Sequence, residues 1–177
     1  EWVFLSTRRL RPIYNIDVIL RAYAQIVERF PNSRLVVVGD DEQGDTLQEL
    51  AKNLGIAERV MFTGWLDRPD LIRMLLLSDV FISVPSSDST ALSLLEAFAA
   101  RLPVIVSDLP ANREWIEPGG NGLLVTPRDV DSLVWAMAEV AHNPSQARQW
   151  GEINRRIVEE RGDQEKEMRK LEQWYRD

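Results

Sequence analysis

The chain has 177 residues, 45% of them hydrophobic, with one histidine and no cysteine. This length and composition suit one globular domain over residues 1–177 with a sizeable core. A formal net charge of −7 argues against nucleic acid or an anionic membrane as a general partner. The absence of cysteine excludes disulfides, thiolate catalysis and cysteine-ligated zinc, and His142 has no second histidine for a metal site.

The two ends of the chain differ in pattern. It opens on Glu1-Trp2-Val3-Phe4-Leu5, already inside a strand pattern and without methionine, so we expect an excised or naturally separated domain. Residues 163–177 are rich in charge but place apolar side chains at helical spacing, which predicts a C-terminal helix. No apolar run approaches the roughly 20 residues that a membrane-spanning helix needs.

Short apolar segments alternate with amphipathic ones along the rest of the chain. The expected strands are 2–6, 35–38, 60–63, 80–84, 104–107 and 123–125. The expected helices are 15 to about 30, 46–54, 69–77, about 89–102, 110–116, 130–141 and 145–161. This alternation predicts an α/β fold with a doubly wound, Rossmann-like parallel sheet of about six strands. Ligands bind such sheets beyond the carboxyl ends of the strands, at a topological switch point.

The stretch from 80 to 106 is the most informative for function. A buried-type strand ends at a turn containing Asp88, and Ser89 and Thr90 can cap the helix that follows. A helix that begins at the carboxyl end of a strand offers free backbone amides and a positive dipole end, which suit phosphate. Seven residues separate Asp88 from Glu96, so two carboxylates flank a site for an anion.

The order and spacing of several short motifs resemble the nucleotide-sugar-binding domain of retaining glycosyltransferases of the GT-B type, family four. That family shows an acidic residue, seven residues and then glutamate within Leu-Glu-Ala. The matching pieces here are Asp88 with Leu95-Glu96-Ala97, Arg9-Leu10 with Pro12, Val38-Gly39-Asp40, Phe62-Thr63-Gly64 and Asn121-Gly122-Leu123. The resemblance covers nearly the whole chain and implies the C-terminal half of a GT-B fold.

The resemblance implies a cytoplasmic hexosyltransferase that moves a sugar from a nucleoside diphosphate sugar to an acceptor hydroxyl. Catalytic roles would fall to Arg9 on the diphosphate, Glu96 on the ribose and Asp88 on the transferred sugar. The family is generally metal-independent, so no cofactor is expected. The donor would contact Arg9, Tyr14, Gly39, Trp65, Leu66, Ser89, Thr90, Ala91, Leu92 and Glu96.

Other interpretations of these residues stay open. On a helical wheel Glu96 lies opposite the bulky apolar stripe, as a solvated glutamate would. Asp88 suits a turn or a cap, Arg9 a solvated basic loop, and Trp65 a structural aromatic. The chain also departs from the family, which has a lysine where Tyr14 stands, glutamate more often than aspartate at 88, and glycines where Ser89 to Ala91 stand.

The resemblance also implies partners that the chain lacks. We expect an absent N-terminal domain to hold the unknown acceptor and to provide any peripheral membrane association, so the isolated chain would show little turnover. Two alternative functions remain open. Asp40-Asp41 after a buried strand resembles a signalling receiver domain, although no lysine occurs between Lys52 and Lys166. A degenerate, non-catalytic GT-B module that serves only assembly is the other.

Overall fold

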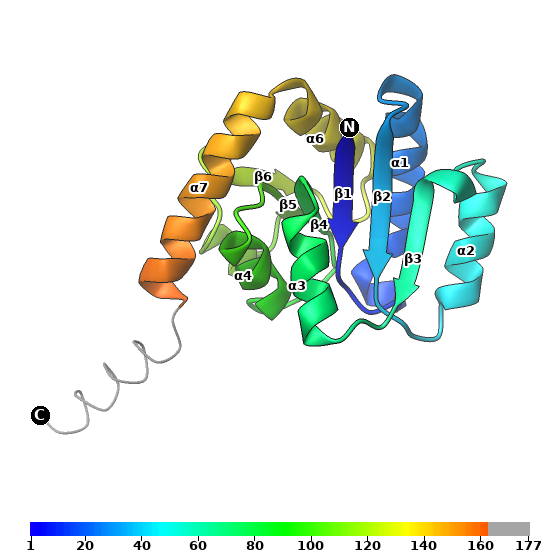
Figure 1. The fold of residues 1–177 in the computed structure, drawn as a ribbon, viewed down its shortest axis with the longest axis horizontal. Helices are drawn as coiled ribbons and strands as arrows, with labels where there is room; N and C mark the ends of the chain where they lie inside the picture. The colour runs from blue at the N-terminus through cyan, green and yellow to red at the C-terminus, as the bar shows by residue number, and fades with distance from the viewer. Residues whose placement is uncertain (163–177) are drawn as a thin grey trace, which may run out of the picture.

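The computed structural model describes residues 1–162, which form one six-stranded sheet in the order β3-β2-β1-β4-β5-β6 (Figure 1). Every neighbouring pair of strands is parallel. The strands are β1 (Trp2–Ser6), β2 (Ser33–Val38), β3 (Val60–Gly64), β4 (Val80–Ser83), β5 (Val104–Ser107) and β6 (Gly122–Val125). All six expected strands are therefore confirmed, whereas the helix expected within 163–177 lies outside the described residues.

Helices cover both faces of the sheet, which makes the fold doubly wound (Figure 1). One face carries α1 (Ile16–Arg29), α2 (Gly44–Asn53) and α6 (Val130–His142), and the other carries α3 (Arg68–Leu76) and α4 (Leu92–Ala99). The last described helix, α7 (Pro144–Arg161), contributes to both cores and packs along α4. Short elements complete the fold: η1 (Pro12–Tyr14), η2 (Ala57–Arg59) and α5 (Pro110–Arg113).

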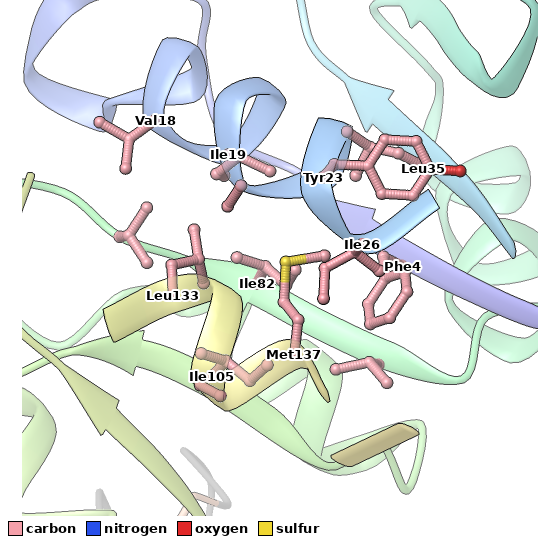
Figure 2. Packing of buried hydrophobic residues seen from close by; sticks show 14 of the residues in the cluster. Phe4, Val18, Ile19, Tyr23, Ile26, Leu35, Ile82, Ile105, Leu133 and Met137 are labelled. Atoms are coloured by element: carbon pink, nitrogen blue, oxygen red, sulfur yellow. The ribbon is translucent and has the colours of Figure 1, made fainter. Parts of the chain in front are cut away.

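The larger core lies between the sheet and the pair α1 and α6 (Figure 2). Helix α1 presents an apolar stripe at helical spacing, and its Tyr23 ring meets Phe4 of β1 edge to face at 6.3 Å between centroids. Ile82 and Ile105 of β4 and β5 are fully buried in the same cluster. Because helices cover both faces, the central strands are apolar throughout rather than alternating, as the sequence predicts.

The strand order places the switch point of the fold between β1 and β4. From β1 the chain winds outward through β2 to β3, and then returns to β4 and winds through β5 to β6. The loops that leave β1 and β4 therefore diverge at the carboxyl edge of the sheet, and a crevice opens between them. These loops are residues 7–11 and 84–91, and both carry predicted site residues.

The start of α4 differs from the prediction. The helix begins at Leu92 with Ala91 as its N-cap, and neither Ser89 nor Thr90 caps it. The Thr90 hydroxyl instead accepts a hydrogen bond from the Trp115 indole at 3.3 Å. The preceding chain is thereby held as a loop, and the helix begins two residues later than a local capping pattern suggests.

Candidate functional site

Buried hydrogen bonds hold the loops on the two sides of the switch point together. Asn15 is fully buried with φ of +52°, and its Nδ2 donates to the Val84 carbonyl at 2.8 Å and to Ser86 Oγ at 2.9 Å. The Ser86 amide in turn donates to the Ile13 carbonyl at 2.9 Å. The loops after β1 and β4 are thus joined across the crevice, which pre-organises whatever their side chains bind.

A cavity of about 330 Å³ lies at the carboxyl edge of β1, β2 and β3. Its walls come from the ends of these strands and the loops that follow them, Arg8 included, and from α3 and α4. It brings together five of the predicted site residues, namely Arg9, Gly39, Trp65, Leu66 and Glu96. A larger cavity of about 450 Å³ lies at the opposite edge, beside Trp2 and Pro103. Only the first has the location at which parallel α/β sheets bind ligands.

Glu96 stands half-buried in the wall of the first cavity. Burial raises the pKa of its carboxyl above the ordinary value, and the charge of Arg68 only partly opposes this shift. Within residues 1–162, no side-chain hydrogen bond or ion pair satisfies the Glu96 carboxylate. An unpaired, partly desolvated carboxylate in a cavity can accept hydrogen bonds from a ligand diol, and such groups concentrate at functional sites.

Gly39 allows the loops after β1 and β2 to meet. Its φ is +135°, and a Cβ at this position would lie 2.6 Å from the Arg8 carbonyl oxygen. Its amide donates to the Gly64 carbonyl at 2.9 Å, which also ties in the loop after β3. The backbone geometry at Gly39 therefore shapes the cavity, and any larger residue would displace the arginine loop.

Arg8 is the site residue that sequence reasoning missed. Its guanidinium donates from Nη2 to Asp88 Oδ2 at 2.6 Å and from Nη1 to Ser93 Oγ at 2.9 Å, so it bridges the switch point. The cluster of three arginines at positions 8, 9 and 11 was the available signal, but the family motif selected Arg9. Arg9 is exposed and lines the cavity, while Arg11 pairs with Asp41 at 2.6 Å.

The remaining predicted residues lie beside the cavity rather than in its wall. Tyr14 lies under Arg8, with 4.4 Å between the guanidinium carbon and the ring centroid. Ser89, Thr90 and Leu92 are exposed, and Ala91 is half-buried. Asp88 accepts a hydrogen bond from the Ser89 amide at 3.0 Å, as a turn residue would. It also pairs with Arg8, a contact that a turn role does not require.

Two features of the described residues bear on other classes of function. Within residues 1–162, no group of three or more histidine, aspartate and glutamate side chains is placed to hold a metal ion. None of the described helices has the length and apolar character required to cross a membrane.

The strand order also decides against the receiver alternative. Receiver domains have the flavodoxin-like order 2-1-3-4-5, in which β1 lies between β2 and β3. Here β1 lies between β2 and β4. The Asp40-Asp41 pair consequently faces the cavity lined by Arg9 and Glu96, and Asp41 is neutralised by Arg11.

Fold and site together define a Rossmann-type domain whose switch point carries arginines, a helix N-terminus and an unpaired carboxylate, as in domains that bind nucleotides. Residues 1–157 match the family model described as glycosyl transferases group 1, and the chain belongs to this family. Its fold is that of the C-terminal domain of a GT-B glycosyltransferase. The predicted fold class is thereby confirmed.

Among curated proteins, the chain is similar to an uncharacterized glycosyltransferase of Methanocaldococcus jannaschii, with 31% identity over 140 residues, which is 79% of this chain and 36% of the relative. It is 35% identical to the D-inositol 3-phosphate glycosyltransferase of Mycobacterium marinum over 144 residues, 78% of this chain and 29% of that protein. The chain spans less than half the length of these relatives.

Solved structures show the same fold. Sucrose-phosphate synthase from Thermosynechococcus elongatus superposes with a TM-score of 0.90 and 27% identity, covering 99% of this chain and 45% of that one. The Anabaena protein HepE, solved in complex with UDP-glucose, gives a TM-score of 0.83 at 22% identity, over 91% of this chain and 44% of that one.

Proposed function

We propose that this chain is the donor-binding domain of a retaining glycosyltransferase, which transfers a sugar from a nucleoside diphosphate sugar to an acceptor hydroxyl. The observation that carries the proposal is the switch-point cavity. It gathers Arg9, Trp65 and Glu96 from three separate parts of the chain around a backbone turn at Gly39. The family membership and the named UDP-glucose complex of a structural neighbour support the same donor class.

The roles follow from the chemistry of each wall. Glu96 would accept hydrogen bonds from the ribose diol, and burial raises the pKa of its carboxyl in the free chain. Trp65, which is 76% exposed, and Leu66 offer an apolar surface to the base. Arg9 and the amides at the start of α4 would hold the diphosphate.

In this proposal the transfer keeps the anomeric configuration, as the resemblance to retaining glycosyltransferases implies. The donor's own phosphate oxygen would take the proton from the acceptor hydroxyl while the bond between the sugar and the diphosphate breaks. Negative charge then grows on the departing diphosphate, and cations and helix amides stabilise it most at that stage. Asp88 would position the sugar through its hydroxyls.

The acceptor site belongs, in this proposal, to an N-terminal domain in the whole protein. Two facts support that division: the chain covers less than half of its curated relatives, and it superposes on the isolated C-terminal domain of a Francisella tularensis family member with a TM-score of 0.82 at 19% identity. We expect the isolated chain to bind donor nucleotides but to transfer no sugar.

Calorimetric titration of UDP, GDP and ADP into the chain tests the proposal. We expect one nucleotide to bind, and Glu96→Ala to weaken it at least about tenfold, because hydrogen bonds to a charged group are lost. Glu49→Ala on α2 is the matched control, since Glu49 is exposed and far from the switch point. If none of the three binds, the chain is better described as a non-catalytic assembly module.

A further inference from the structure

The Arg8 guanidinium is held on three sides at the mouth of the switch point. It donates to Asp88 Oδ2 at 2.6 Å and to Ser93 Oγ at 2.9 Å, and it stacks on the Tyr14 ring at 4.4 Å. Its side chain is only 11% exposed. A planar guanidinium fixed in this way is preorganised for acceptors in one direction, unlike a mobile surface arginine.

Arg8 lies between a helix N-terminus and a carboxylate. Ser93 is the second residue of α4, so Arg8 lies beside the free amides and the positive dipole end of that helix. Asp88 is the one carboxylate that meets the guanidinium within the described residues. Its other oxygen accepts from the Ser89 amide, so both carboxylate oxygens of Asp88 are hydrogen-bonded within the chain.

The Thr7 hydroxyl, next to Arg8 in the chain, is closed to solvent and has no hydrogen-bond partner within residues 1–162, and the Ser6 hydroxyl shares this state. Thr7 lines the cavity with Arg9 and Glu96. An unpartnered buried hydroxyl is costly, so the start of the loop that carries Arg8 holds unsatisfied polar groups in the free chain.

We propose that Arg8 is the second cation that binds the donor diphosphate, and that donor arrival transfers Arg8 from Asp88 to a phosphate. A phosphate offers more charge and more acceptor oxygens than a carboxylate, so the exchange is favourable. It also releases Asp88 for the hydroxyls of the sugar. This inference rests on the proposed function.

The same geometry gives Tyr14 a role different from the one expected from the sequence. Its ring lies under the guanidinium and orients it, so Tyr14 is a positioning residue rather than a phosphate contact through its hydroxyl. Arg8 thereby supplies the positive charge that a lysine at position 14 would bring.

The experiment is calorimetric titration of three nucleoside diphosphates, each compared with its parent nucleoside, into the full chain and its variants. The pairs are UDP with uridine, GDP with guanosine, and ADP with adenosine. Arg8→Ala should weaken the bound diphosphate about ten- to a hundredfold and leave the parent nucleoside unaffected, because a charge-assisted contact to phosphate is lost. Arg73→Ala, an exposed arginine on α3, is the control for net charge.

Two further variants separate this inference from a structural role. Asp88→Asn removes the competing carboxylate, so it should tighten diphosphate binding at least about twofold, in the direction opposite to Arg8→Ala. Tyr14→Ala should weaken diphosphate but not nucleoside binding, and Tyr14→Phe should restore it. Asp88→Asn is informative even if Arg8→Ala does not fold.

The outcomes are distinguishable. If the unaltered chain binds none of the nucleotides, both the proposed function and this inference are overturned. If it binds one and Glu96→Ala weakens it, but Arg8→Ala binds equally well or Asp88→Asn binds more weakly, the donor site stands and the role of Arg8 is overturned.

Discussion

Replacement of Asn15 tests whether the joined loops are the foundation of the site. Asn15→Ala removes the two hydrogen bonds from Nδ2 to Val84 and Ser86. It also places alanine, which tolerates the left-handed conformation less well than asparagine, at φ of +52°. The left-handed conformation costs about 1 to 2 kcal/mol for an ordinary residue. The two lost Nδ2 hydrogen bonds add about 1 kcal/mol each, and the longer bonds that Asn15 Oδ1 accepts from Ser86 and Arg128, both at 3.3 Å, are lost with them. We therefore expect the free energy of unfolding to fall by about 3 kcal/mol.

Asn15→Gly separates the two contributions. Glycine adopts the left-handed conformation without strain but cannot make the hydrogen bonds, so it should cost about 0.5 to 1 kcal/mol less than alanine after its greater freedom in the unfolded chain is included. Urea unfolding followed by circular dichroism measures both, with an unchanged m-value as the sign that the unfolded state is unaltered.

The loss for Asn15→Ala corresponds to a fall in Tm of about 6 to 12 °C in a domain of this size. The reasoning is refuted if Asn15→Ala unfolds within about 0.5 kcal/mol of the unaltered chain, the range of ordinary surface substitutions. It is equally refuted if alanine proves more stable than glycine, because the strain at φ of +52° would then be absent.

Four further predictions concern the site and its support. Burial raises the pKa of the Glu96 carboxyl, and hydrogen bonds from the ribose require the ionised form. Nucleotide affinity should therefore be highest above that raised pKa and fall as pH drops through it. Glu96→Gln should lose this pH dependence when the nucleoside, which has no phosphate to titrate, is the ligand. The same pKa shift means that the protonated Glu96 carboxyl stabilises the fold at low pH, and that this contribution is lost as pH rises through the folded-state pKa. As pH rises through that range, the urea midpoint of the unaltered chain should therefore fall relative to that of Glu96→Gln. Gly39→Ala would place a Cβ 2.6 Å from the Arg8 carbonyl oxygen, and we expect weaker nucleotide binding by calorimetry together with a lower Tm. Gly151→Ala would place a Cβ 2.0 Å from the Arg101 carbonyl oxygen, where α7 meets the end of α4. We expect the free energy of unfolding to fall by about 1 to 3 kcal/mol and Tm to fall by several degrees. An unchanged Tm would show that the two helices can move apart without cost.

The sequence by itself determined the elements and the class of fold. Strand and helix periodicity are local properties, so the six apolar segments and the helices between them could be located before any tertiary contact was known. The Asp88 and Glu96 spacing and the motif around Arg9 also lie within short stretches. They sufficed to predict a donor site at the carboxyl edge of a parallel sheet, and the family match agrees with that class.

Tertiary structure decided which residues meet at the site. On the helix alone, Glu96 has the position of a solvated glutamate, whereas in the folded chain it is half-buried, and this burial raises the pKa of its carboxyl. Arg8 and Asp88 are 80 residues apart, and only the placement of β1 beside β4 brings them together. The close approach of the Gly39 and Arg8 backbones likewise joins two loops that are distant in the sequence. Strand order and loop contacts are long-range properties, and a local pattern carries no information about them.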